Sequence, residues 1–153
     1  VVAEPEAVRP VGAEAAHHLG LLVLQKLVLL LQQLAGEEPA AGDAALAHFA
    51  RLIHDTVRGA DVAARIGGEE FAIWLPGASL QYGAKVAEHI RITLGTTSWD
   101  WQGRSWPLSA SFGVAAVPDT TRSIANLPAQ ADAALLEAKR QGRNRVETAR
   151  PIG

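Results

Sequence analysis

The stretch "RIGGEEF", residues 65–71, places two glycines directly before two carboxylates and a phenylalanine. Neither Gly67–Gly68 nor Glu69–Glu70 favours the middle of a strand. A glycine pair lets the backbone turn with positive φ and lets a bulky ligand come close, because no Cβ obstructs it. Carboxylates beside an open backbone suit a hard cation such as Mg²⁺, which prefers oxygen ligands and often shares them with substrate phosphates. From the residues alone, a metal and phosphate site and an exposed acidic turn are equally good interpretations.

The composition narrows the class of protein. The chain has 153 residues, 48% of them hydrophobic, which suits a single globular domain. Its net charge of -2 gives no general attraction to nucleic acid, so we expect no nucleic-acid partner. The absence of cysteine excludes a disulfide scaffold, cysteine-ligated zinc and a thiol nucleophile. The sequence also contains no methionine, so we expect it to be a piece of a longer protein.

The leucine-rich stretch at residues 19–36 resembles a membrane helix in composition. Lys26 and several glutamines interrupt it, and its apolar core is shorter than the roughly 20 residues that a membrane span needs. We therefore expect a buried strand over residues 20–25 and an apolar segment to Leu34. Residues 1–18 show no clear period and are expected to be a lead-in segment, followed by one domain over 19–150.

The elements that must position the signature follow from periodicity and turn residues. Apolar residues at helical spacing predict a helix over residues 42–57, capped by Asp43. Short apolar runs on both sides of "GGEE" predict a β-hairpin. The other expected elements are a helix over 79–94 capped by Ser79, a tryptophan-bearing hairpin over 99–106, a strand over 108–117, a helix over 126–142 and a strand over 144–149. This order predicts an α+β fold, an α/β sandwich with a central mixed sheet of about five strands flanked by helices.

Four motifs together resemble one known family. "RIGGEEF" resembles the signature of the GGDEF family of diguanylate cyclases, in its GGEEF form. "AAGD" at 40–43, "SASFGVAA" at 109–116 and "ADAALLEAKRQGRNRV" at 131–146 resemble three further family motifs. Each motif alone is weak, but four in the right order and at the right separations are specific, and the resemblance covers roughly residues 20–147. It implies a fold similar to polymerase palms and class III nucleotide cyclases.

The resemblance also implies a reaction. Two GTP molecules, held by a homodimer whose signature hairpins face each other, form cyclic di-GMP and two pyrophosphates with the help of Mg²⁺. By this resemblance Glu69 is the metal ligand and Glu70 lies beside the reacting atoms. The implied substrate-binding residues are Gly67, Gly68, Asp43, Lys139 and Arg143. Lys139 and Arg143, four positions apart, would share a helix face and clamp the terminal phosphates, although cations at a helix end also occur without any ligand.

The sequence departs from the family pattern at the end of the first strand. The family places there an aspartate that binds both metals, and a few residues later an asparagine that reads guanine. Lys26 and Leu34 stand at these positions, or Gln25 and Gln33 if the strand is shifted by one residue. Neither alternative supplies the carboxylate, and only Asp43 is left to recognise the base. The departures therefore predict impaired catalysis.

A second family site is retained. "RGAD", residues 58–61, matches the R-x-x-D motif through which family members bind their product as an inhibitor. Arg58 could fork onto O6 and N7 of guanine while Asp61 accepts from guanine N–H groups. His89 stands where a further arginine often completes this site, and Arg91 lies nearby. The alternative is an exposed salt bridge of little energetic consequence.

Three functional hypotheses follow. We prefer a cyclic di-GMP receptor that acts through Arg58 and Asp61 and signals to fused sensor or effector domains. The alternative is an active diguanylate cyclase that uses GTP and Mg²⁺, and a third hypothesis is a dimerisation domain without nucleotide binding. The resemblance implies a bacterial cytoplasmic location, with or without a membrane tether outside this chain.

Overall fold

The computed structural model of the chain describes residues 19–26, 39–97 and 99–153. The expected lead-in over 1–18, and the expectations for Leu34 and Gln33, lie outside the described residues. The elements, in chain order, are β1 (Leu19–Lys26), α2 (Pro39–Thr56), β2 (Val62–Arg65), β3 (Glu70–Pro76), α3 (Leu80–Thr96), β4 (Trp99–Trp101), β5 (Arg104–Trp106), β6 (Ala110–Val117), the 3-10 turn η2 (Ile124–Asn126), α4 (Leu127–Arg140) and β7 (Val146–Thr148).

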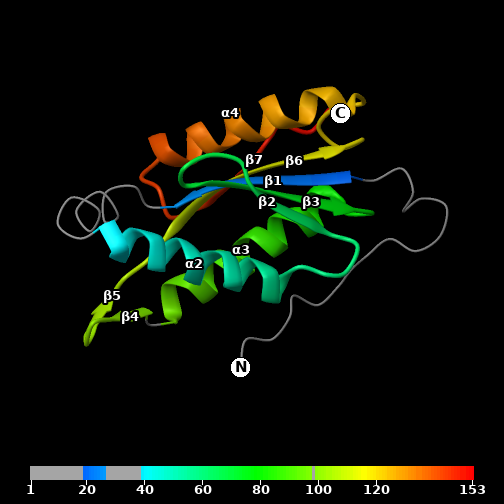
Figure 1. Ribbon diagram of the computed structural model, residues 1–153. Coiled ribbons are helices and arrows are strands. Elements are labelled where there is room, and N and C mark those ends of the chain that lie inside the picture. Colours follow the sequence, from blue (N-terminus) through cyan, green and yellow to red (C-terminus); the bar gives the residue numbers. More distant parts are fainter. Residues whose placement is uncertain (1–18, 27–38, 98) are drawn as a thin grey trace.

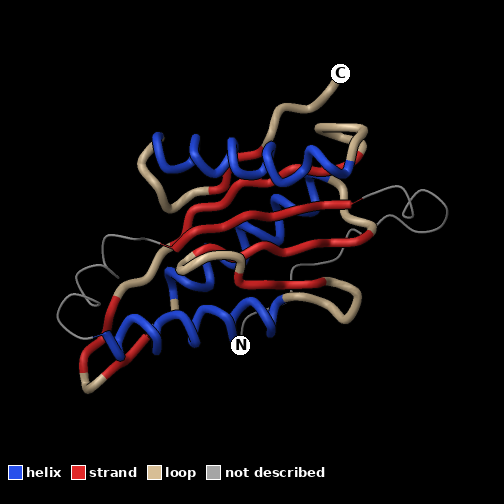
Figure 2. Tube along the Cα trace, turned by 45° about the horizontal axis from the view of Figure 1, so that its top comes forward, coloured by secondary structure: helices blue, strands red, loops and turns tan. Residues whose placement is uncertain are grey.

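Five strands form one mixed sheet in the order β2-β3-β1-β6-β7. All neighbours are antiparallel except β6 and β7, which are parallel. Helix α4 covers one face of the sheet, and α2 and α3 cover the other (Figure 1). Figure 2 shows the strands between α4 and α2. The predicted α+β class, the mixed five-stranded sheet and the signature hairpin between β2 and β3 are confirmed.

The two faces of the sheet differ in side-chain size. Strand β3 turns Phe71 and Ile73 toward α2 and α3, and the intervening Ala72 toward α4, as the two-residue period of a strand requires. Phe71 meets Phe49 of α2 edge to face, with ring centroids 5.3 Å apart. The core therefore lies mainly on the side of α2 and α3.

The opposite face brings α4 unusually close to β6. A Cβ added to Gly113 would collide with the backbone of Ala131 and Leu135, so only glycine fits where the helix crosses the strand. Ala115, on the same face, is fully buried beside Leu135. Small side chains on this face thus determine how closely α4 lies against the sheet.

Most of the expected element ends are confirmed. Ser79 caps α3, its hydroxyl accepting the Tyr82 N–H at 3.1 Å. The turn of the tryptophan hairpin uses positive φ angles at Gln102 and Gly103, 51° and 76°. Asp43, however, does not cap α2: the helix already begins at Pro39, because proline is well tolerated in a first turn. None of the described helices combines the length and apolar character needed to cross a bilayer.

Candidate functional site

The signature turn joins β2 to β3 over residues 66–69, and a side chain holds it in place. The Arg65 guanidinium donates to the backbone oxygens of Gly67 and Gly68, at 3.2 and 2.6 Å. Neither glycine has a positive φ, so that expectation was wrong; the conformation is held by Arg65 rather than by left-handed backbone. A Cβ at Gly68 would meet no atom within 4 Å. The glycines therefore leave the tip open to a ligand, as expected.

Glu70 begins β3 beneath the open turn and meets two charged groups from α4. Burial raises the pKa of Glu70, the negative charge of Asp132 raises it further, and Lys139 opposes both. Hydrogen bonding with the Asp132 side chain raises the pKa of Glu70 as well, as the smallest of these effects. Sequence reasoning identified Glu70 and Lys139 but missed Asp132. Its position two helical turns before Lys139, on the same face of α4, was the available signal.

The way in which α4 ends determines where the next cationic residue, Arg143, lies relative to the helix. The helix ends in a Schellman motif: the Gly142 N–H donates to Lys139 O at 3.4 Å and the Arg143 N–H to Ala138 O at 2.9 Å. Gly142 is left-handed, with a φ of 115°. The prediction that Lys139 and Arg143 share a helix face was therefore wrong, because the helix has ended before Arg143. Lys139 lies in the last turn of α4 and Arg143 follows three residues after the helix ends; this end of α4 lies above the signature turn in the view of Figure 1.

The strand beside Glu70 carries no carboxylate at the matching position. Gln25 of β1 is paired with Glu70 of β3 on one side and with Ser111 of β6 on the other, and Lys26 follows it. Within the described ranges, no three His, Cys, Asp or Glu side chains lie close enough together to hold a metal ion. Glu69, the residue expected to bind metal, lies half-buried in the turn.

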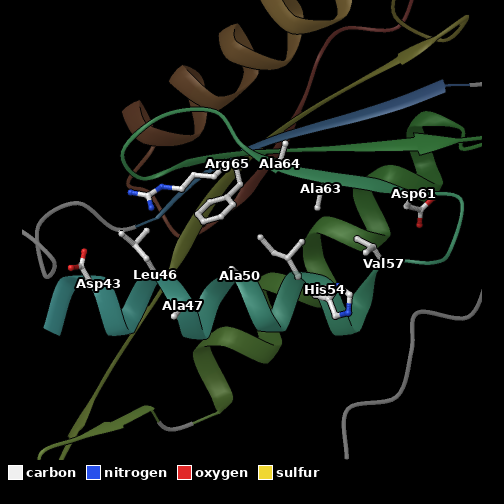
Figure 3. Close-up of a pocket in the computed structure, with 12 residues that line it drawn as sticks. Asp43, Leu46, Ala47, Ala50, His54, Val57, Asp61, Ala63, Ala64 and Arg65 are labelled. Carbon is white, nitrogen blue, oxygen red and sulfur yellow. The ribbon is translucent and has the colours of Figure 1, made fainter. Parts of the chain in front are cut away.

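A groove of about 560 Å³ runs between α2 and β2, a size typical of small-molecule sites. Its apolar wall includes Leu46 and Phe71. Asp43 and Arg65 lie at one end of the groove and Asp61 at the other (Figure 3). An apolar wall with a carboxylate at its end suits a planar ring whose edge carries N–H donors.

The residues "RGAD" form a compact turn at the C-terminal end of α2. The Arg58 N–H donates to Asp61 Oδ2 at 2.9 Å, and the Asp61 N–H donates to Arg58 O at 2.9 Å. The Arg58 guanidinium lies over the Tyr82 ring, 5.6 Å from its centroid. Both Arg58 and Asp61 are half-buried. The turn thus presents a cation and a carboxylate next to each other.

The two residues expected to assist this turn lie on different flanks of α3. His89 is two helical turns after Tyr82, so it shares the side on which Arg58 lies. Arg91 is nine positions after Tyr82, about half a turn away around the helix at 100° per residue. It pairs with Glu88 and donates to Asn144 Oδ1 at 3.2 Å. Helical spacing therefore puts His89, but not Arg91, on the flank of α3 that carries Tyr82.

The candidate residues consequently form two separate sites. The hairpin site comprises Gly67, Gly68, Glu69, Glu70, Asp132, Lys139 and Arg143. The RGAD site comprises Arg58 and Asp61. Helix α2 runs from Asp43, at the hairpin end of the groove, to the RGAD site at the other end (Figure 3).

Comparisons with known proteins identify the family of this domain. The family model described as "Diguanylate cyclase, GGDEF domain" matches residues 17–145. The chain is 42% identical over 106 residues to the uncharacterized protein YhcK of Bacillus subtilis, covering 69% of this chain and 30% of that protein. It is 39% identical over 107 residues to diguanylate cyclase A of Treponema denticola, covering 70% of this chain and 29% of that protein.

A solved structure shows the same architecture. The GGDEF domain of DgcB from Caulobacter crescentus, in complex with c-di-GMP, is 28% identical and superposes with a TM-score of 0.78, covering 89% of this chain and 82% of that chain. The chain spans less than a third of the length of the two relatives named above. The family match takes in β1, the signature hairpin, α4 and the "RGAD" turn. This chain belongs to the GGDEF domain family of diguanylate cyclases.

Proposed function

We propose that this domain is a receptor for cyclic di-GMP that binds the nucleotide at the RGAD site. The observation that carries the proposal is the preorganised turn in which Arg58 and Asp61 are joined by two 2.9 Å hydrogen bonds and the Arg58 guanidinium lies over Tyr82. Preorganisation lowers the entropy that a ligand must overcome when it orders a site. The c-di-GMP complex of the similar DgcB domain supports the choice of ligand.

The chemistry of the RGAD site matches the edge of guanine. Guanine offers two acceptors, O6 and N7, to a guanidinium fork, which is the arrangement that Arg58 can supply. An ionised carboxylate has about four acceptor positions, and the Arg58 N–H uses one of those on Asp61. A carboxylate is also the type of acceptor that suits the N–H donors on the edge of the same base. His89, on the same flank of α3, would extend the contact area.

Two observations support impaired catalysis at the hairpin site. The β1 residue paired with Glu70 is Gln25, so the strand supplies no carboxylate where two-metal chemistry needs one. Burial and the negative charge of Asp132 raise the pKa of Glu70, so the carboxylate form, the better ligand for a cation, is less favoured there than in water. The loss of a metal ligand without compensation destabilises the transition state more than the ground state, because negative charge accumulates during phosphoryl transfer.

An active cyclase is the second candidate, favoured by the proximity of Glu70 and Lys139 beneath an open glycine turn. In that case Glu69 would hold Mg²⁺, which would supply charge neutralisation for the leaving pyrophosphate. Lys139 and Arg143 would bind the terminal phosphates, and Asp43 would accept from guanine N–H groups. Two copies with facing hairpins would be required, since each substrate attacks the other.

The setting of the domain is also part of the proposal. The domain extends over residues 19–150, forms a homodimer, works in the bacterial cytoplasm and passes its state to fused domains. Its relatives are more than three times as long as the matched segment, which supports such fusions.

Calorimetric titration with cyclic di-GMP tests the receptor. We expect Arg58→Ala to weaken binding at least about tenfold, since a bidentate arginine contact to guanine contributes roughly 1–3 kcal/mol. Arg51→Ala, the same change at an exposed arginine of α2, the helix that precedes the RGAD turn, is the matched control and should bind like the wild type. Unchanged binding by Arg58→Ala would refute the assignment of the site. Formation of cyclic di-GMP from GTP and Mg²⁺ by a dimeric preparation would establish the second candidate.

A further inference from the structure

Arg91 connects two parts of the molecule that are distant in sequence. Its Nε donates to Glu88 Oε2 at 2.9 Å and its Nη2 donates to Glu88 Oε1, an arrangement that holds the guanidinium plane in one orientation. Its third nitrogen, Nη1, donates to Asn144 Oδ1 at 3.2 Å and to Asn144 O at 3.5 Å. All three nitrogens are therefore engaged, and α3 is joined to the turn that follows α4.

The turn that Arg91 contacts has an unfavourable backbone. Arg143 and Asn144 both have positive φ angles, 65° and 45°, and such conformations cost non-glycine residues roughly 1 kcal/mol or more each. They persist only where surrounding contacts hold them. One contact is the Schellman bond to Ala138, and another is the Asn144 N–H donated to Ser111 Oγ at 3.1 Å. Arg91 supplies a further contact, from a different helix.

We propose that Arg91 is a positioning residue for phosphate binding: it holds the Asn144 turn so that Arg143 stays beside Lys139 at the hairpin site. This inference rests on the proposal that Lys139 and Arg143 bind nucleotide phosphates. Arg91 does not itself bind the phosphate, because Glu88 neutralises it and Asn144 occupies its remaining nitrogen. Mutual hydrogen bonding raises the pKa of Arg91 and lowers that of Glu88, in agreement with a tightly formed pair.

This role differs from the one that the sequence suggested for Arg91. The family resemblance placed it near the RGAD site, but the side chain lies on the flank of α3 that faces Asn144, away from the Tyr82 side. The two roles predict different ligands. A positioning role at the hairpin site affects GTP, whereas a contact at the RGAD site affects cyclic di-GMP.

The test is a calorimetric comparison of GTP and cyclic di-GMP binding, with Mg²⁺ present throughout. We expect Arg91→Ala to weaken GTP binding roughly fivefold to tenfold, the effect of losing about one hydrogen bond that orders the site. Asn144→Gly removes the Oδ1 acceptor, leaves only the longer contact to the backbone oxygen, keeps a residue that tolerates positive φ, and should have a similar effect. Cyclic di-GMP affinity should be unchanged in both. Arg140→Ala, an exposed arginine at the end of α4, is the control for lost charge.

A double-mutant cycle separates positioning from general destabilisation. If Arg91 acts through Arg143, then Arg91→Ala has no further effect on GTP affinity in an Arg143→Ala background. Additive losses would overturn the inference, as would unchanged GTP affinity in Arg91→Ala or a loss confined to cyclic di-GMP. Absence of GTP binding by the wild type would also overturn it. The receptor proposal would then be tested separately, by titrating the wild type with cyclic di-GMP.

Discussion

The two sites are built in different ways. Asp61 of the RGAD site lies at one end of the groove along α2, and Arg65, which holds the signature turn of the hairpin site, lies at the other end. The RGAD site is local: Arg58 and Asp61 are three positions apart and bond to each other, with one supporting ring from α3. The hairpin site is assembled over long range, since Glu70 comes from β3 and its charged neighbours Asp132 and Lys139 come from α4. A local site tolerates small movements of the scaffold, whereas a distributed site depends on how α4 lies against the sheet.

Replacing Gly113 should produce the largest difference between ligand binding at the two sites. In Gly113→Ala the new Cβ collides with the backbone of α4, so we expect a loss of roughly 3 kcal/mol in the free energy of unfolding. Chemical denaturation measures this loss. In the fraction that remains folded, GTP binding should weaken much more than cyclic di-GMP binding, because α4 carries only hairpin-site residues.

A second glycine provides the control for this prediction. Gly95 lies in α3, and a Cβ there would meet nothing within 4 Å. Gly95→Ala should therefore stabilise the domain by roughly 0.5–1 kcal/mol through better helix propensity. Equal weakening of both ligands in folded Gly113→Ala would contradict the distinction between a local and a distributed site.

The next largest effect should come from Asp61→Asn. Asparagine keeps an oxygen that accepts the Arg58 N–H, so the turn and the stability of the domain should be preserved. The lost negative charge should still weaken cyclic di-GMP binding roughly tenfold, since hydrogen bonds to charged groups contribute about 1.5–3 kcal/mol. Titration calorimetry measures the loss, and Asp55→Asn, an exposed aspartate near the end of α2, is the control. If Asp61→Asn bound cyclic di-GMP with wild-type affinity, the Asp61 carboxylate would stabilise the turn without binding the nucleotide.

Asp132→Asn tests the long-range assembly of the hairpin site. Removing this negative charge should lower the pKa of Glu70, which can be followed by NMR titration of its carboxyl carbon. Because the folded-state pKa of Glu70 is raised, its contribution to stability is present at low pH and is lost as pH rises through that pKa. Asp132→Asn should reduce this loss. An unchanged Glu70 titration would show that α4 does not act on the carboxyl group.

The smallest effect is expected at His48, in the middle of α2 between the two sites. Burial, and then the charge of Arg51, lower the pKa of His48, and its Nε2 is buried without a hydrogen-bond partner in the structure. A lowered pKa means that the folded state disfavours protonation, so stability should decrease as pH falls below 6.5. His48→Phe, which retains an aromatic ring beside Trp99, should flatten this dependence in thermal unfolding. An unaltered pH dependence would assign the effect to other groups.

The contrast between local and distributed construction also explains what the sequence could predict. The Ser79 cap, the Gln102–Gly103 turn and the end of α4 near Gly142 are determined by neighbours in sequence, and all three are confirmed. The spacing of "RGAD" likewise anticipated two residues that lie together. Local patterns were sufficient wherever the interacting groups are a few positions apart.

Features that depend on tertiary contacts were missed. Three contacts could be identified only once the fold was known. They are the hydrogen bonds from Arg65 to the glycine carbonyls, the proximity of Asp132 to Glu70, and the hydrogen bond from Arg91 to Asn144. The start of α2 was misplaced because proline, which ends helices elsewhere, is favoured in a first turn. In each case the deciding partner or position lay outside the window of the local pattern.

The most direct test of the receptor claim is a calorimetric titration of the wild-type domain with cyclic di-GMP, repeated at saturating GTP and Mg²⁺. Two separate sites predict binding of cyclic di-GMP with the same affinity in both titrations. No binding of cyclic di-GMP, or its displacement by GTP, would contradict the account, because either result would show that the RGAD site is not an independent nucleotide site.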